Sequence, residues 1–231
     1  MKLLHIIATP RDQASNTLRI SSVFLDELSS RNEDLQLETL DLFNRDLPSV
    51  AGDNIEAKYH LMAGLSIDKE QKESWRQIEH LIEHFLAADL YLITAPMWNF
   101  GIPYTLKYYI DAIVQPGYLF RYNEYGQAEG LVTNKKMFCI TSRGGDYSPG
   151  SPFHAYDFQE PYLRAIFGFV GITDISFINA NTMDVTPDLR EESIERAIAD
   201  VKQIAANTEW HAENLASPRE HPQGLKPPVI D

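Results

Sequence analysis

A set of side chains of types suited to binding a phosphate lies near the start of the chain, in the segment ATPRDQASNT. Where an apolar run ends and a helix-like stretch begins, the chain carries Arg11, Ser15, Asn16 and Thr17. The N-terminus of a helix offers free backbone N–H groups and partial positive charge, and an arginine fork with hydroxyl groups completes a cradle for a phosphate. Ser15 could instead serve only as the cap of that helix, and these residues alone leave both interpretations open.

An aromatic segment, PMWNF, follows a second apolar run. A proline fixes its backbone, and the residues after the proline offer backbone amides, one side-chain amide and flat apolar surface. The residues concerned are Pro96, Met97, Trp98, Asn99 and Phe100. A flat heteroaromatic ring fits this set, whereas the alternative is that Trp98 and Phe100 are core residues covering the end of a sheet.

A glycine pair follows a third apolar run, in the segment SRGG formed by Ser142, Arg143, Gly144 and Gly145. Adjacent glycines let a backbone approach a ligand closely, and their N–H groups can bind a carbonyl or an anionic ring nitrogen. Glycine pairs also occur in plain turns, so the prediction of a ligand site depends on the three segments together. The chain has neither GxGxxG nor GxxxxGK(S/T), which disfavours tight dinucleotide binding by a Rossmann loop.

Strands and helices are expected to alternate along the chain. Strands are predicted at residues 3–8, 35–42, 89–95, 135–141 and 173–179. Helices are predicted at residues 15–31, 72–88, 103–114, 157–170 and 186–213, the last with Thr186 as N-cap and Pro187 in its first turn. This alternation predicts an α/β fold with a doubly wound parallel sheet and helices on both faces, because right-handed crossovers place a helix between parallel strands. Ligands bind outside the carboxyl ends of such strands, so the three segments are expected to meet there.

Composition favours one globular domain over residues 1–216, followed by a proline-rich tail over residues 217–231. The net charge of −13 would repel phosphate backbones and anionic lipids, so we expect a small substrate and no nucleic-acid or membrane partner. The single cysteine, Cys139, excludes an internal disulfide framework and agrees with a reducing compartment. The first apolar run is too short for a signal peptide and no later run is long enough to span a bilayer, so a cytoplasmic location is expected.

Two further patterns are interpreted as structural. HLIEH matches the H-x-x-E-H pattern of some zinc peptidases, but helical spacing puts His80, Glu83 and His84 opposite the apolar face of their helix. We therefore predict a solvated surface there and no metal site. Cys139 lies within an apolar strand, which favours a packed thiol over a nucleophile.

Several longer segments resemble one family of flavoproteins. These are PMWNFGIPYTLKYYID, FRYNEYGQAEGLVTNKK, ITSRGG and EPYLRAIFGFVGITD, with the weaker TPRDQASNT, and they cover most of residues 1–180. They resemble the FMN-dependent NADH-azoreductase and NAD(P)H:quinone oxidoreductase family. The resemblance implies a flavodoxin-like three-layer fold with a five-stranded parallel sheet in the order 2-1-3-4-5. It also implies that FMN phosphate binds at Arg11, Ser15, Asn16 and Thr17, with the ring against Pro96–Phe100 and Ser142–Gly145.

The activity implied by this resemblance is a ping-pong transfer of two electrons from NADH or NADPH to quinones, azo compounds or similar aromatic acceptors. The hydride chemistry would be carried by FMN, with no catalytic side chain, and the amides of Gly144 and Gly145 could stabilise charge on the ring. A homodimer with active sites at the interface is implied. Our candidates for substrate contacts are Phe120, Tyr122, Tyr147 and Phe167, and Tyr147 stands where relatives often have histidine.

Two alternatives to the enzyme remain open at this point. One is an FMN electron carrier or flavin-responsive binding protein without NAD(P)H oxidase activity of its own. The other is a member that has lost its flavin and serves as a structural partner. The sequence also leaves open the choice between NADH and NADPH, the natural acceptor and the role of the tail.

Overall fold

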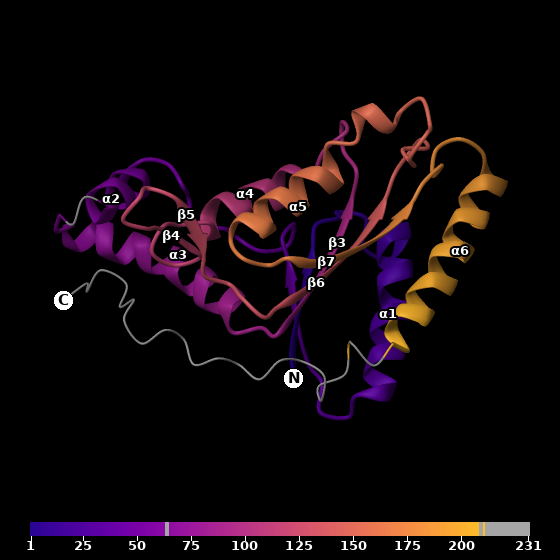
Figure 1. The fold of residues 1–231 in the computed structure, drawn as a ribbon, viewed down its shortest axis with the longest axis horizontal. Coiled ribbons are helices and arrows are strands. Elements are labelled where there is room, and N and C mark those ends of the chain that lie inside the picture. The colour runs from indigo at the N-terminus through magenta and orange to yellow at the C-terminus, as the bar shows by residue number, and fades with distance from the viewer. Residues whose placement is uncertain (63–64, 208–209, 211–231) are drawn as a thin grey trace.

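The computed structural model describes residues 1–62, 65–207 and 210, and it is built around one parallel sheet (Figure 1). The strands are β1 (Lys2–Ile7), β2 (Gln36–Asp41), β3 (Leu90–Pro96), β6 (Lys136–Ser142) and β7 (Asp174–Ala180). Their spatial order is β2-β1-β3-β6-β7, and each neighbouring pair is parallel. In chain order of these five strands this is 2-1-3-4-5, so the predicted α/β class and strand order are confirmed.

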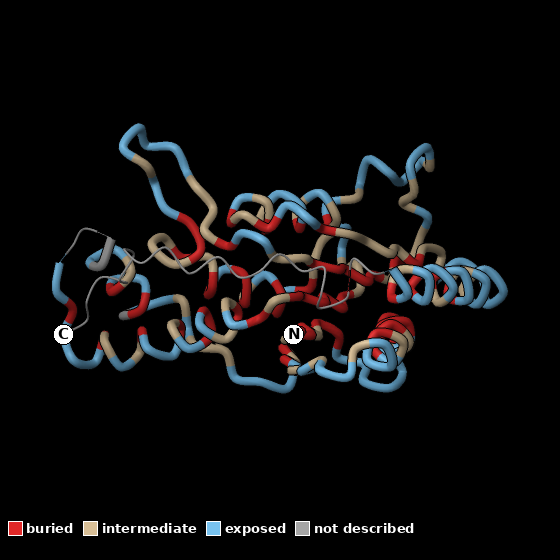
Figure 2. The backbone as a smooth tube through the Cα atoms, turned by 60° about the horizontal axis from the view of Figure 1, so that its bottom comes forward, coloured by how far each residue is buried: buried red, intermediate tan, exposed pale blue. Residues whose placement is uncertain are grey.

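Helices cover both faces of the sheet, as predicted (Figure 1). One face carries α1 (Asn16–Arg31) and α6 (Pro187–Ala205), and the other carries α3 (Lys69–Leu86), α4 (Tyr104–Ile113) and α5 (Gln159–Phe169). Figure 2 shows that buried residues gather in the middle of the molecule, between these layers. The three-layer arrangement therefore leaves the ends of the strands as the places where loops can form a site.

Side chains of the central strands alternate between two cores. Leu90 and Leu92 of β3 pack toward α1 and α6, whereas Tyr91 and Ile93 pack toward α3, α4 and α5. A strand covered on both faces needs apolar residues at every position, which explains the continuous apolar run at residues 89–95.

Helix boundaries follow their capping residues. Asp68 and Gln71 form a reciprocal capping box, so α3 begins at Lys69, before the predicted start at residue 72. The Thr186 side chain accepts a hydrogen bond from the Leu189 N–H, and Pro187 occupies the first turn of α6, as predicted. Helix α6 ends at Ala205. Residues 208–209 and 211–213 of the predicted helix, and the tail at 217–231, lie outside the described residues.

The sequence analysis missed a helix and a hairpin. Helix α2 (Asp53–Met62) packs beside α3, and β4 (Phe120–Tyr122) pairs antiparallel with β5 (Ala128–Gly130). Each strand of the hairpin has only three residues, which is too short for a period to be recognised. The hairpin is therefore an insertion between α4 and β6 that leaves the order of the main sheet unchanged.

The base of the hairpin lies directly against the end of α5. The Val132 N–H donates a 2.8 Å hydrogen bond to the Val170 carbonyl. A Cβ on Gly130 would lie 2.4 Å from both the Gly171 nitrogen and the Val170 carbonyl carbon. Gly171 itself has a φ of +108°, a conformation that favours glycine. Only a residue without a side chain fits at Gly130, because the two backbones are in contact.

The structural interpretation of HLIEH holds for two of its three polar residues. His80 and Glu83 are exposed on α3. The prediction for His84 is wrong, because its ring is partly buried and its Nε2 lies 2.5 Å from a carboxylate oxygen of Glu38 on β2. Cys139 is fully buried, and burial raises the pKa of its thiol, as expected for a packed residue. Among the described residues, no helix combines the length and apolar character needed to cross a bilayer.

His5 is a buried titratable group on β1. Its Nε2 lies 2.8 Å from the Thr94 hydroxyl. Burial lowers the pKa of His5 from 6.5 to about 4, against a smaller opposing influence of Asp41. The unfolded chain takes up a proton at this imidazole below about pH 6.5, while the folded protein does so only near about pH 4. The stability contributed by neutral His5 is therefore present above this window and is lost as the pH falls through it.

Lowering the pH from about 7.5 to about 5 is expected to reduce the free energy of unfolding by about 2 kcal/mol through His5 alone. His5→Gln removes the titration while keeping a polar partner for Thr94, so this variant should lose that part of the pH dependence. Urea unfolding followed by tryptophan fluorescence at both pH values measures the difference. His80→Gln, at an exposed position, should keep the wild-type pH dependence. Equal pH dependence in all three proteins would contradict the prediction.

Candidate active site

The three segments singled out in the sequence meet at one edge of the sheet. In Figure 1 the arrowheads of β3, β6 and β7 point toward the side where α1 begins. The Ala8 N–H donates to the Thr94 carbonyl at 2.9 Å, and the Met97 N–H donates to the Ser142 carbonyl at 2.8 Å. The loops after β1, β3 and β6 are thus neighbours, as expected for the carboxyl ends of parallel strands.

The loop after β1 leads into the first turn of α1. The Ser15 hydroxyl oxygen accepts a hydrogen bond from the Leu18 N–H at 3.3 Å, so Ser15 does cap the helix. The N–H groups of Asn16 and Thr17 lie in the first turn and have no intrahelical acceptor. Arg11 is exposed, and within the described residues its guanidinium makes no hydrogen bond or ion pair. This loop therefore offers N–H groups and one cation to an anion outside the helix.

A side-chain hydrogen bond joins this first turn to the loop after β6. The Thr17 and Ser142 hydroxyl oxygens are 2.6 Å apart. Asn16 donates from its side-chain amide to the Met183 sulfur at 3.6 Å. The helix N-terminus and the glycine loop are therefore held together by contacts within the protein.

The loop after β3 makes a tight two-residue turn. Trp98 and Gly101 exchange backbone hydrogen bonds of 3.0 and 2.9 Å. Asn99 and Phe100 at the turn centre have φ values of 47° and 70°. Turns of this kind favour glycine at such positions, and a bulky residue with positive φ is strained. The strain marks this turn as a candidate functional feature and places the Phe100 ring at its tip.

The two aromatic residues of this loop have different surroundings. Trp98 is half-buried, and its ring centroid lies 5.7 Å from that of Phe43 and 6.2 Å from that of Tyr104. Phe100 is 41% exposed. The alternative that these aromatics are core residues therefore holds in part for Trp98, which packs on other rings, but not for Phe100.

The glycine loop after β6 uses its carbonyl groups internally and leaves its N–H groups free. The Asp184 N–H donates to the Gly144 carbonyl at 3.0 Å, and the Thr182 N–H donates to the Gly145 carbonyl at 2.9 Å. Within the described part of the chain, the N–H groups of Gly144 and Gly145 donate to no acceptor. Two adjacent free donors form a site for a carbonyl oxygen or an anionic nitrogen.

Comparison with known proteins identifies the family of the chain. A family model described as a flavodoxin-like fold matches residues 1–205. The chain is 36% identical over 204 residues to the FMN-dependent NADH:quinone oxidoreductase of Nitratidesulfovibrio vulgaris strain DP4, covering 88% of this chain and 97% of that protein. It is 40% identical over 206 residues to FMN-dependent NADH:quinone oxidoreductase 2 of Trichormus variabilis, covering 89% and 98%. The chain belongs to the FMN-dependent NADH:quinone oxidoreductase family.

Solved structures agree with membership of this oxidoreductase family. An azoreductase from Bacillus anthracis strain Sterne superposes with a TM-score of 0.81 at 27% identity, covering 89% of this chain and 98% of that one. An FMN-dependent NADH-azoreductase from Bacillus anthracis strain Ames Ancestor, in complex with FMN, gives a TM-score of 0.81 at 25% identity with the same coverage. The resemblance found in the sequence and the expectation of an enzyme are confirmed.

In this oxidoreductase the Arg143 side chain lies against the carboxylate of Asp157. Its Nη1 lies 2.8 Å from Asp157 Oδ2, and its Nε donates to the Thr141 hydroxyl at 3.2 Å. Burial lowers the pKa of Arg143, while the charge of Asp157 opposes this effect. The side chains of Arg143 and Asp157 are only 2% and 7% exposed. Arg143 was predicted as a cofactor contact. Its guanidinium instead forms a buried ion pair with Asp157.

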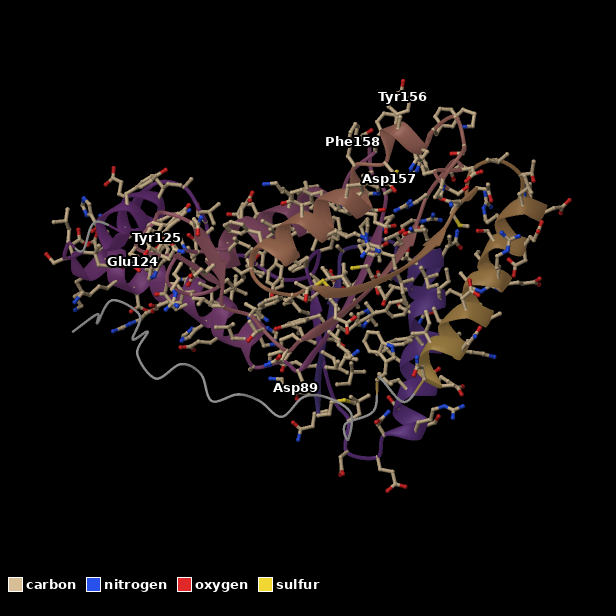
Figure 3. The ribbon with its side chains drawn as sticks, in the orientation of Figure 1. Asp89, Glu124, Tyr125, Tyr156, Asp157 and Phe158 are labelled. Atoms are coloured by element: carbon tan, nitrogen blue, oxygen red, sulfur yellow. The ribbon has the colours of Figure 1, made fainter. Side chains whose placement is uncertain are left out.

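The predicted substrate residues are not brought together within one chain. Tyr147 lies beside Gly145 and its ring centroid is 6.4 Å from that of Phe100. Phe120 and Tyr122 belong to the hairpin, whose labelled tip residue Tyr125 lies far from Tyr156 in Figure 3. Of the residues predicted for substrate contact, Tyr147 lies at the candidate site, through its contacts with Gly145 and Phe100.

Phe167 is a correction to the predicted site. Its side chain is fully buried, and its ring stacks on Phe85 with a centroid distance of 6.2 Å. It packs in the core between α5 and α3 and lines no surface of the single chain. The sequence pattern of the helix predicted at residues 157–170 does not show whether Phe167 faces the core or a site.

Sequence analysis also missed aromatic residues near the glycine loop. Phe153, Tyr156 and Phe158 are 51%, 49% and 58% exposed. The Phe158 N–H donates to the Phe100 carbonyl at 3.0 Å, which joins this segment to the turn after β3. The density of aromatic residues in PFHAYDF, just after the glycine pair, is a signal that could have identified them.

Proposed function

We propose that this protein is an FMN-dependent NAD(P)H oxidoreductase that transfers two electrons, by a ping-pong mechanism, to quinones, azo compounds or similar aromatic acceptors. The observation that carries the proposal is the direct link between an anion site and a ring site. Free N–H groups begin α1, free N–H groups lie at Gly144 and Gly145, and the hydrogen bond between Thr17 and Ser142 joins the two. A cofactor with a phosphate at one end and a polar ring at the other fits this pair of sites.

The residues present fit FMN. Arg11, the N–H groups of Asn16 and Thr17, and the Ser15 hydroxyl would hold the phosphate. The segments Pro96–Phe100 and Ser142–Gly145 would hold the ring. Bound FMN would supply a ring that accepts a hydride from the reduced nicotinamide and passes two electrons to the acceptor.

The role of the chain's own residues is to bind and orient. Gly144 and Gly145 would direct two N–H groups at the edge of the ring where negative charge develops, and such donors are prearranged before the reaction. The Thr182 and Asp184 N–H groups hold the glycine carbonyls, so the glycine donors are fixed in place. The lack of a dinucleotide fingerprint suits a nicotinamide that binds only briefly.

The proposal includes a homodimer in the cytoplasm. Phe120 and Tyr122 belong to the hairpin, where Tyr122 is 58% exposed and Phe120 is 8% exposed. In a dimer these residues would contribute to the acceptor site of the other subunit, while Tyr147 would contribute within its own subunit.

Anaerobic titration tests the proposed function. The purified protein should show a flavin spectrum, and NADH or NADPH should bleach it in a stoichiometric reaction without any helper protein. Adding a quinone should restore the oxidised spectrum. A bound flavin that neither nicotinamide reduces would instead favour the electron-carrier alternative, and a protein that cannot be reconstituted with FMN would favour the member that has lost its flavin.

Arg11→Ala is expected to raise the Kd for FMN by about 10- to 150-fold, the range for one charged hydrogen bond worth about 1.5–3 kcal/mol. Fluorescence quenching of FMN by the apoprotein measures this Kd. Arg19→Ala serves as the matched control, because Arg19 lies on α1, the helix that follows the Arg11 loop, and is exposed in an ion pair with Glu191. Equal FMN affinity in the two variants would remove Arg11 from the phosphate site.

A further inference from the structure

Four aromatic rings form a continuous surface beside the candidate flavin site. We call Phe100, Tyr147, Phe153 and Tyr156 the aromatic patch. Ring centroids are 5.4 Å apart for Phe100 and Tyr156, 6.4 Å for Phe100 and Tyr147, 6.1 Å for Tyr147 and Phe153, and 6.4 Å for Phe153 and Tyr156. Each ring thus contacts two others, and three of the four residues are between 41% and 51% exposed. A contiguous exposed aromatic surface of this kind is a candidate binding site.

The aromatic patch adjoins both loops that would hold the ring of the cofactor. A Cβ on Gly145 would lie 3.5 Å from Tyr147 Cε2 and 4.0 Å from Phe153 Cδ2, so these two rings reach the glycine pair. Phe100 stands at the tip of the strained turn after β3. In Figure 3, Tyr156 and Phe158 lie on the side of the molecule where the strands end. A molecule placed over the flavin ring would therefore extend onto the aromatic patch.

The segment that carries the patch is held in place by polar contacts. Asp157 accepts from the buried Arg143 guanidinium, and the Phe158 N–H donates to the Phe100 carbonyl. The His154 ring nitrogen Nδ1 lies 3.0 Å from the Tyr147 carbonyl oxygen. A surface ordered in advance loses less conformational entropy when a ligand binds.

The charges near the patch disfavour an anionic ligand. Residues 144–158 contain two aspartates, one histidine and no lysine or arginine. The adjacent Arg143 is paired with Asp157 and only 2% exposed. A pyrophosphate or a sulfonate would find no free cation in this segment. The chemistry therefore favours an uncharged aromatic ligand.

We propose that the aromatic patch binds the second ring of an uncharged acceptor with two fused or linked aromatic rings, while the reacting ring lies over the flavin. This inference rests on the proposed function and adds to it a substrate class and two specificity residues, Phe153 and Tyr156. A quinone with one ring is too small to occupy both places. The protein therefore discriminates among acceptors by ring number through this patch.

The double variant Phe153→Ala/Tyr156→Ala tests the inference. FMN-loaded protein is reduced with dithionite without oxygen and mixed with 1,4-naphthoquinone or 1,4-benzoquinone, and flavin reoxidation is followed by stopped flow. The second-order rate constant for naphthoquinone is expected to fall about 10-fold, the size of two lost aromatic contacts. The rate constant for benzoquinone should change less than about 2-fold, since its single ring has no partner on the patch.

Two controls define the result. Tyr59→Ala removes an exposed tyrosine from α2, outside the site, and should leave both rate constants unchanged. Phe153→Tyr/Tyr156→Phe keeps both rings and should retain the wild-type preference for naphthoquinone.

Three outcomes would overturn the inference. Equal loss for both quinones would show a general defect. In a separate steady-state assay with NADH, a selective rise in the KM for NADH would show that the patch holds adenine. Dissociation of a dimer in sedimentation velocity, in the double variant alone, would show that a second copy covers the patch. Because dithionite replaces the nicotinamide, this test stays informative even if NADH and NADPH fail to reduce the flavin, which would refute only the proposed function.

Discussion

Asp157→Asn is expected to lower the free energy of unfolding by about 3 kcal/mol, because it leaves the buried Arg143 guanidinium without its counter-charge. Both side chains are nearly inaccessible, and the distance between Nη1 and Oδ2 is 2.8 Å. The expected value is at the low end of the range for broken buried pairs because Glu160 Oε2 remains 3.9 Å from Arg143 Nη2. The native Asp157 Oδ1 accepts from the N–H groups of Gln159 and Glu160, and asparagine can keep these helix-capping bonds.

Urea unfolding followed by tryptophan fluorescence measures this change. The double variant Arg143→Met/Asp157→Asn is the matched control, because it removes the uncompensated charge as well as its partner. It should recover most of the lost stability, since an apolar replacement of a buried pair is often neutral. If the double variant is as unstable as the single one, the loss does not come from an unpaired charge.

Gly130→Ala is expected to lower the free energy of unfolding by about 3 kcal/mol or more, because a new Cβ would collide with backbone atoms that cannot rotate away. The added atom would lie 2.4 Å from the Gly171 nitrogen and from the Val170 carbonyl carbon. The hydrogen bond between Val132 and Val170 would have to lengthen for the two segments to separate. The change therefore acts on the attachment of the whole hairpin.

Thermal and urea unfolding of this variant should be compared with those of Gly168→Ala. Gly168 lies on α5, one turn from the same contact, and a Cβ there would meet nothing within 4 Å. Alanine in a helix is more favourable than glycine, so this control should be neutral or more stable. Similar losses in both variants would contradict the steric explanation.

The main elements of the fold could be predicted from sequence because their physical signals are strong. The apolar run at residues 89–95 is buried on both faces, and Thr186 with Pro187 identifies the start of α6. The hairpin and α2 could not be predicted in the same way. The three-residue strands of the hairpin are held by contacts with α5, which are distant in sequence.

The candidate site was predictable at the level of loops, less so at the level of side chains. Topology brings the segments around Ser15, Trp98 and Gly144 together, since parallel strands end at one edge. The direction of a side chain depends on partners that the pattern does not reveal. Asp157, fourteen residues further on, binds Arg143, and Phe85 of another helix packs against Phe167.

The contact between the backbones at Gly130 and Gly171 has a consequence for assembly. A hairpin joined to its domain by a flexible linker samples many orientations, and binding a partner restricts these orientations at an entropic cost. Here the hydrogen bond of the Val132 amide and the glycine contact fix the base of the hairpin against α5. A partner that binds the hairpin would therefore meet it in a fixed orientation. Association would resemble the docking of rigid bodies, with a small loss of conformational entropy on binding.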